Sequence, residues 1–188
     1  MHIPKKGLRA LGIAESYTGR SISRLAGVVM RKDLRIDGFT FSTVTVGGTD
    51  ATAAVLRMMN ELERNDINAI MLSGCIIAWF NIINPARIAQ ETGKPVICVT
   101  YEDSEGLLPE ICHHFPGDTE RISAYKNLGE RIRVELHTQQ TIFIRCWGID
   151  AGDGTRLCND FTIEGRIPEP LRVARLLARK LKPAPENR

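Results

Sequence analysis

Apolar and polar positions alternate along the first quarter of the chain as they do in β-strands. Three segments follow this pattern, at residues 7–16, 23–31 and 34–46. A period of two residues places the apolar side chains on one face of a sheet. Three consecutive strands joined by short connections predict an antiparallel meander at the start of the fold.

The hydrophobic period then changes to that of a helix. In residues 47–62 the apolar side chains share one helical arc and the charged ones lie opposite. Residues 67–73 form a continuous apolar run, which is typical of a strand covered on both faces. A helix that Asn84 caps, with Pro85 at its first position and Gly93 at its end, separates this run from the next apolar strand, at 95–101. Strand, helix and strand in this order predict a right-handed parallel crossover.

The rest of the chain predicts a helix at 119–130, a strand at 140–148 and a last helix from Glu169. The expected fold class is therefore α/β, with a mixed sheet in which parallel crossover strands follow the meander and helices cover both faces. The length suits one domain over residues 1–188, and we expect a disordered tail at about 183–188.

Two of the expected parallel strands end in side chains that could act in a site, Ser73 and Tyr101. Ligands bind at the carboxyl ends of such strands. Ser73 does not stand in a G-x-S-x-G motif, and the sequence aims no histidine at it. Cys75 is an alternative nucleophile, although a cysteine in an apolar strand is usually just packed. The run Cys112 to His114 spreads over different faces of a helix, which makes a poor metal site.

Charge is distributed unevenly along the chain. Lys and Arg number 25 against 22 Asp and Glu, which gives a net charge of +3. Residues 1–35 carry eight basic and two acidic side chains, and residues 165–188 carry seven and two, so the middle of the chain is acidic. The ends could form a binding surface for an anionic partner or a merely solvated face.

Five cysteines without a C-x-x-C pair, and no run of membrane-spanning length, lead us to expect a cytoplasmic protein without a membrane partner.

The last predicted helix is amphipathic. Its apolar arc consists of Leu171, Ala174, Leu177, Ala178 and Leu181. The opposite stripe is basic and consists of Arg172, Arg175, Arg179 and Lys182. Four cations at this spacing can follow a phosphate backbone from one side, and they can equally keep the chain in solution.

Carboxylates offer a route to metal-dependent catalysis. Glu15 ends the first strand, Asp37 lies in the third, and Asp50 begins the first helix. A two-metal nuclease needs acidic ligands in such positions. Each acid also has a structural interpretation, because Asp50 can cap the helix, Asp37 with Gly38 can mark a bulge, and Glu15 can be a surface residue.

Four strings resemble endonuclease V, the ribonuclease H-like nuclease that cuts next to deaminated bases, and resemble more closely a related archaeal family of unknown function. They are GIAESY (12–17), IMLSG (70–74), GKPVICVTY (93–101) and GRIPEPLRVARLLA (165–178). The last has the Pro-x-Pro entry of the final helix in endonuclease V. The likeness covers nearly the whole chain. It implies a ribonuclease H-like fold, a nucleic-acid partner that is DNA or RNA, and Mg²⁺ or Mn²⁺ as cofactor.

The chain departs from this pattern at the positions of the metal ligands. The resemblance puts Ala14 and Ser73 where two metal-binding aspartates stand, Tyr101 where a lysine stands and Arg175 where a histidine stands. Asp50 falls near the position of the second acid. Because a serine hydroxyl is neutral, it is a poor ligand for Mg²⁺.

Three hypotheses follow. The first is an endonuclease V-like nucleic-acid-binding protein with a degraded metal site and little or no nuclease activity. The second is a divergent Mg²⁺- or Mn²⁺-dependent endonuclease on DNA or RNA with deaminated or modified bases, which uses Glu15, Asp37 and Asp50. Glu15 can replace the acid missing at Ala14 only if the strand bulges, since neighbours on a strand face opposite sides. The third is a small-molecule hydrolase built on Ser73 or Cys75. We favour the first, because the metal ligands have changed while the scaffold persists.

Overall fold

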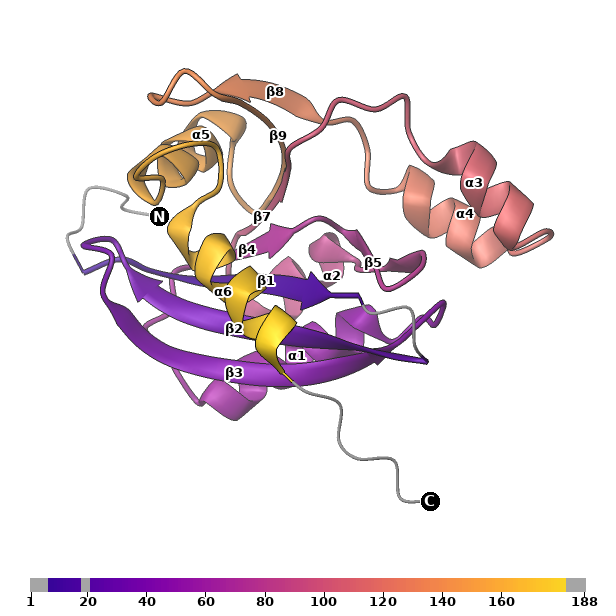
Figure 1. Ribbon diagram of the computed structural model, residues 1–188, viewed down its shortest axis with the longest axis horizontal. Helices are drawn as coiled ribbons and strands as arrows, with labels where there is room; N and C mark the ends of the chain where they lie inside the picture. The colour runs from indigo at the N-terminus through magenta and orange to yellow at the C-terminus, as the bar shows by residue number, and fades with distance from the viewer. Residues whose placement is uncertain (1–6, 18–20, 182–188) are drawn as a thin grey trace.

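The computed structural model describes residues 7–17 and 21–181, and a seven-stranded mixed sheet forms its centre (Figure 1). Lys182 of the basic stripe and the tail expected at 183–188 lie outside the described residues. The strand order is β3-β2-β1-β4-β7-β9-β8. The seven strands are β1 (Arg9–Ser16), β2 (Ile22–Arg31), β3 (Ile36–Thr45), β4 (Ala69–Ser73), β7 (Val96–Thr100), β8 (Ile132–Glu135) and β9 (Thr141–Trp147).

The sheet has the mixed topology that the sequence predicts. β1, β2 and β3 form the antiparallel meander, and β1, β4 and β7 are parallel neighbours. β9 and β8 extend the sheet with antiparallel pairs. Val29 of β2 pairs with Gly38 and Met30 pairs with Ile36, which leaves Asp37 as an extra residue in β3. Asp37 therefore sits in a bulge.

Helices cover both faces of this sheet (Figure 1). On one face the helices are α1 (Ala51–Leu62) and α2 (Pro85–Thr92), and on the other they are α5 (Ala151–Asp160) and α6 (Glu169–Lys180). The short helices α3 (Leu108–His114) and α4 (Thr119–Lys126) project to one side. A buried apolar cluster fills the space between the sheet and each pair of covering helices. Within the described residues, no helix is long and apolar enough to cross a membrane.

Local signals explain why some elements are readable from the sequence and others are not. The Asn84 side chain accepts a hydrogen bond from the Arg87 N–H at 3.0 Å, and Gly93 ends α2 with φ of 63°. By contrast, α5 contains glycines, which weaken a helix prediction. A Cβ at Gly154 would lie 2.5 Å from Cys146 Sγ, so packing against β9 requires the glycine. The small hairpin of β5 (Ile76–Ile77) and β6 (Asn81–Ile82) was not predicted either.

A glycine sets the position of α6 over the sheet. A Cβ added at Gly12 of β1 would lie 2.5 Å from the Pro170 carbonyl carbon and 2.7 Å from its oxygen. The absence of a side chain lets the first turn of α6 rest directly on the strand backbone. α6 then runs along β1 and β2, with Leu171, Ala174 and Ala178 buried against them. This packing fixes where the basic side of α6 lies relative to the strand ends.

Candidate functional site

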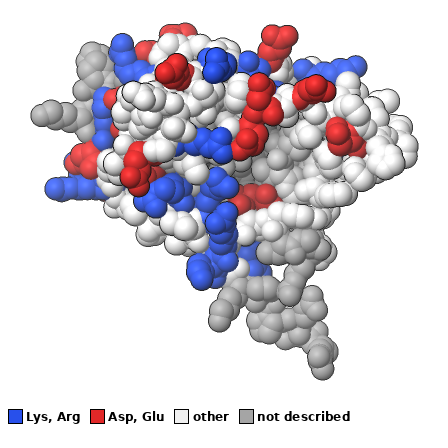
Figure 2. Space-filling model, turned by 45° about the horizontal axis from the view of Figure 1, so that its top comes forward, with Lys and Arg blue, Asp and Glu red and all other residues white. Residues whose placement is uncertain are grey.

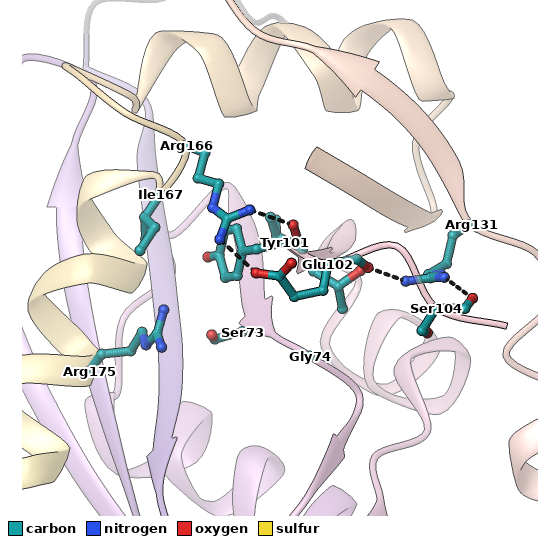
Figure 3. A pocket seen from close by; sticks show the side chains of 11 residues that line it. Ser73, Gly74, Tyr101, Glu102, Ser104, Arg131, Arg166, Ile167 and Arg175 are labelled. Atoms are coloured by element: carbon teal, nitrogen blue, oxygen red, sulfur yellow. Dashed lines mark hydrogen bonds and ion pairs between the residues drawn. The ribbon is translucent and has the colours of Figure 1, made fainter. Parts of the chain in front are cut away.

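A pocket of about 410 Å³ opens at the carboxyl ends of β4 and β7, between α6 and the loop that follows β7 (Figure 3). Pockets of this size hold small ligands. Ser73 ends β4 and Tyr101 directly follows β7, and other segments contribute three arginines, Arg131, Arg166 and Arg175. The pocket lies where open α/β sheets usually bind their ligands.

Ala14, Ser73 and Tyr101 face the same side of the sheet. Ala14 is packed in the apolar cluster beneath α6, and Ser73 and Tyr101 each follow by two residues a strand residue buried in that cluster. Side chains on a strand alternate, so all three point towards α6. Ile13 pairs with Leu72, which makes Ala14 and Ser73 neighbours on adjacent parallel strands. The structure therefore brings together the two positions that the resemblance assigned to metal-binding aspartates, Ala14 and Ser73, with Tyr101 on the same side of the sheet.

Two of the pocket arginines are already bonded. Arg166 donates to the backbone carbonyl of Tyr101 at 2.7 Å and to the carboxylate of Glu102 at 2.6 Å. Arg131 donates to the carbonyls of Glu102 at 2.8 Å and Ser104 at 2.6 Å. These bonds hold the loop after β7 from both sides (Figure 3). Arg166 and Arg131 thus shape the pocket and add positive charge to it.

Three hydrogen-bond donors in the pocket lack partners of normal geometry among the described residues. The guanidinium of Arg175 lies 5.7 Å from the centre of the Tyr101 ring and extends towards Ser73 (Figure 3). The Tyr101 hydroxyl is buried without a hydrogen bond, although it lies near the Ser73 hydroxyl. Burial raises the pKa of Tyr101, while the charge of Arg175 opposes the rise. The phenol therefore stays protonated and can donate.

Glu15 lies on the opposite face of β1. It follows by two residues Ile13, which belongs to the apolar cluster beneath α1 and α2. Its carboxylate accepts hydrogen bonds from the Ser23 hydroxyl and the Ala78 N–H, yet burial raises the pKa of Glu15. Pairing of β1 with β2 is regular through this position. β1 thus lacks the bulge that Glu15 would need to replace the acid that the resemblance implies at Ala14.

Asp50 and Asp37 do not line the pocket either. Asp50 accepts hydrogen bonds from the Thr45 N–H at 3.1 Å and the Asn81 amide at 2.6 Å, and it makes no side-chain cap for α1. Burial alone would raise the pKa of Asp50, but the bonds from Asn81 and Thr45 outweigh it and lower the pKa. Asp37 pairs with Arg9 at 2.6 Å, at the start of β1. The three acids are therefore not gathered at one site.

The pocket residues do not fit the Mg²⁺ or Mn²⁺ that the resemblance implies. Over residues 7–17 and 21–181, no group of three or more His, Cys, Asp or Glu side chains is placed to hold a metal ion. The floor of the pocket presents neutral hydroxyls beside a guanidinium, whereas Mg²⁺ requires charged oxygens. Glu102, the carboxylate that lines the pocket, is bound by Arg166. This donor set suits an anion.

Neither Ser73 nor Cys75 has the activation that a nucleophile needs. Cys75 is buried, and burial raises the pKa of its thiol, so the reactive thiolate is disfavoured. The described histidines make their contacts elsewhere, in an aromatic cluster at α3 and beside Asn159. His2 lies outside the described residues. The geometry does not favour a small-molecule hydrolase.

The basic stripe of α6 is only partly available for a ligand. Arg172 pairs at 2.6 Å with Glu169, whose side chain is buried. Arg175 and Arg179 have no ion pair within the described ranges, which end before Lys182, and Arg179 is exposed. Figure 2 shows basic side chains gathered in a band down the middle of the face where α6 lies, with acidic ones on both sides of it.

Sequence patterns missed Arg131 and Arg166 as pocket residues, because both project from irregular segments that only tertiary contacts place. Arg166 stands inside the string GRIPEP, so the motif carried a signal that could have pointed to it. Arg131 precedes the short edge strand β8, which the sequence did not predict, and no motif marks it.

Known proteins resemble this chain along most of its length. A family model described as endonuclease dU matches residues 6–182. A UPF0215 protein of Pyrobaculum calidifontis is 40% identical over 173 residues, which cover 89% of this chain and 93% of that protein. The crystal structure of a protein of unknown function from Archaeoglobus fulgidus matches with a TM-score of 0.79 and 25% identity, over 91% of this chain and 96% of that one. Endonuclease V of Ciona intestinalis, in complex with a 24-mer DNA containing an inosine followed by a ribo-adenosine, matches with a TM-score of 0.60 and 16% identity, over 93% and 85%.

Proposed function

Because the chain belongs to the endonuclease dU family, we propose that it binds nucleic acid along α6 and in the strand-end pocket, with little or no cleavage of the two-metal kind. The resemblance to endonuclease V and to an archaeal family of unknown function is confirmed for family and fold. The proposal is carried by the donor set at the strand ends, where Ser73, Tyr101 and Arg175 stand in place of a carboxylate cluster.

Electrostatics support nucleic acid, DNA or RNA, as the partner. Phosphate backbones are bound mainly by Lys and Arg, and a protein gains affinity by releasing the counterions that surround them. Arg175 and Arg179 lie one helical turn apart on the side of α6 that faces away from the core, and Arg175 reaches the pocket. A backbone that follows α6 would therefore pass the pocket entrance and could place one nucleotide in it.

We expect the protein to bind inosine-containing DNA and RNA oligonucleotides and deoxyuridine-containing DNA. It should leave all of them essentially uncut in Mg²⁺ or Mn²⁺. The charge that stabilises the attacking water and the leaving oxygen in a two-metal site is missing from the pocket. Gel-shift titration measures binding, and denaturing gels measure cleavage of the same labelled strands. Robust cleavage that disappears in Glu15→Gln or Asp50→Asn would overturn this expectation.

A second candidate is a divergent endonuclease that acts at deaminated bases, and the family description favours it. Its acids would be Glu15 and Asp50, which both contact the hairpin of β5 and β6 on the side of the sheet away from the pocket. The matched control is Asp37→Asn. Asp37 is a β3 residue that pairs with Arg9 at the start of β1, whereas Glu15 lies near the end of that strand. This candidate requires deoxyuridine-dependent cleavage that survives Asp37→Asn and is abolished in the other two variants.

Replacing Arg172, Arg175 and Arg179 together by glutamine should weaken oligonucleotide binding and flatten its salt dependence. The slope of log K against log salt should fall by roughly 0.7–0.9 for each phosphate that the protein no longer neutralises. Because Glu169 already neutralises Arg172, most of the change should come from the other two arginines. Arg172→Gln alone is therefore the matched control. Fluorescence anisotropy at several salt concentrations measures the slope. An unchanged slope in the triple variant would mean that the basic stripe of α6 keeps the protein in solution and does not contact phosphates.

A further inference from the structure

Among the described residues, four buried side-chain polar atoms lack a hydrogen-bond partner, and of these the Tyr101 hydroxyl is the one whose residue lines the pocket. Buried polar atoms in proteins almost always have a hydrogen-bond partner, and an exception calls for a ligand or water that supplies one. This hydroxyl is buried and protonated, and it makes no hydrogen bond of normal geometry with the described residues, although the Ser73 hydroxyl lies near it. Arg175, from a different element, also has no acceptor in the part of the chain that the structure describes, and its guanidinium points towards the Ser73 hydroxyl (Figure 3).

We propose that the strand-end pocket binds a phosphate group through Arg175, Ser73 and Tyr101 and needs no divalent metal ion to do so. The guanidinium takes the place in which the resemblance expects a metal site, and it supplies the positive charge directly. The inference rests on the proposed function insofar as the phosphate belongs to a nucleic acid. The chemistry recognised is the phosphate oxyanion, in a nucleotide or free.

The donor types match a phosphate better than a cation or a neutral ligand. A guanidinium binds phosphate oxygens with two parallel hydrogen bonds, and such charge-assisted bonds are the strong ones. Hydroxyls of serine and tyrosine can donate to further oxygens of the same group. An acceptor placed among the three would satisfy the orphan phenol, which a bound metal ion could do only by displacing its proton.

The surrounding charges favour an anion as well. Three guanidinium groups line the pocket against one carboxylate, that of Glu102. Asp103 lies 3.6 Å from Arg131 at the rim and is 84% exposed, so solvent screens much of its charge. Counting both acids, the pocket keeps a positive balance. Arg166 and Arg131 are held by backbone carbonyls and act as fixed positive charges behind the site.

The test is calorimetric binding of three phosphate probes in buffer with EDTA and again with Mg²⁺. The probes are inorganic phosphate, thymidine 5′-monophosphate and the dinucleotide TpT, which represent a free ion, a monoester and a diester. We expect at least one probe to bind equally well with and without the metal. Arg175→Gln should weaken that binding by about 10- to 100-fold, and Ser73→Ala or Tyr101→Phe by about 3- to 10-fold each.

The matched control is Arg179→Gln, which removes the same charge one turn further along α6 and leaves the pocket intact. It should change binding of the small probes less than twofold. If Arg179→Gln lowers the affinity for the probes as much as Arg175→Gln does, then the effect comes from the overall charge of α6, and the proposed site is wrong. Binding that vanishes in EDTA, or the absence of binding by all three probes, would overturn it too. Circular dichroism shows whether each variant folds, and Arg175→Lys, which keeps the charge but loses the planar fork, should recover only part of the affinity.

Failure of this inference and failure of the proposed function give different results. If oligonucleotides bind the parent protein and Arg175→Gln equally, then the protein binds nucleic acid but the proposed phosphate site is wrong. If TpT and oligonucleotides fail to bind while inorganic phosphate or the monophosphate binds through Arg175, the site stands and its ligand is a small phosphate compound.

Discussion

Replacing Gly12 by alanine is expected to lower the free energy of unfolding by about 2–3 kcal/mol, near the upper end for overpacked cores. The added methyl group would lie within 2.7 Å of three atoms of Pro170, two of them backbone atoms that cannot rotate away. The first turn of α6 must therefore lift from β1. Because Arg175 lies on the same helix, the shift should also weaken oligonucleotide binding.

Gly38→Ala is the matched control for this experiment. It adds the same methyl group to another strand glycine, where the nearest atom would lie 3.6 Å away. Alanine there should be neutral or slightly stabilising, since glycine in a strand loses more backbone entropy on folding. Urea unfolding measures both variants. If the two midpoints agree, then the helix is not seated on the strand as closely as the structure indicates.

Gly12 illustrates what the sequence can and cannot predict about the fold. Periodicity predicted the meander, the crossover and α6, because each has a clear apolar face and α2 has explicit end signals at Asn84 and Gly93. The neighbouring sequence does not explain why Gly12 and Gly154 must be glycine. Each is required because an element that is distant in the sequence packs closely against it. The sequence does not predict α5, β8 or the β5–β6 hairpin, again because tertiary packing is needed to form them. They are short or rich in glycine, and tertiary contacts decide their structure.

The candidate site was predictable to the extent that it depends on strand alternation. A period of two residues puts Ala14 and Glu15 on opposite faces of β1, and the structure has this arrangement. That Ser73 and Tyr101 share the face of Ala14 follows from the strand register in the structure. The lack of acceptors around Arg175 and Tyr101 could not be read from the sequence, because it depends on how α6 lies over the sheet. The resemblance therefore pointed to Ala14 and Ser73 as positions where endonuclease V has carboxylates, and the structure places hydrogen-bond donors around Ser73.

Restoring acids at the strand ends should create a metal site. We expect the triple change Ala14→Asp, Ser73→Asp and Arg175→His to tighten Mn²⁺ binding by roughly tenfold or more over the parent, since the number of charged ligands sets the affinity for hard cations. Neighbouring parallel strands lie about 4.8 Å apart, and both new carboxylates would face α6. Isothermal calorimetry measures the gain. Because Ala14 is buried, the metal-free variant should be less stable and should regain melting temperature as Mn²⁺ is added.

Two further variants separate a true site from added negative charge. The double change Ala14→Asp and Ser73→Asp keeps Arg175, whose guanidinium should pair with the new carboxylates, so its gain in Mn²⁺ affinity should be smaller than that of the triple variant. Ala53→Asp with Asn60→Asp adds two acids on the exposed side of α1 and should give no gain. If the triple variant neither binds Mn²⁺ more tightly nor is stabilised by it, then Ala14 and Ser73 do not occupy the ligand positions. The interpretation of the pocket as a metal site converted to an anion site would then lose its structural basis, because it depends on those two residues and Arg175 sharing one location.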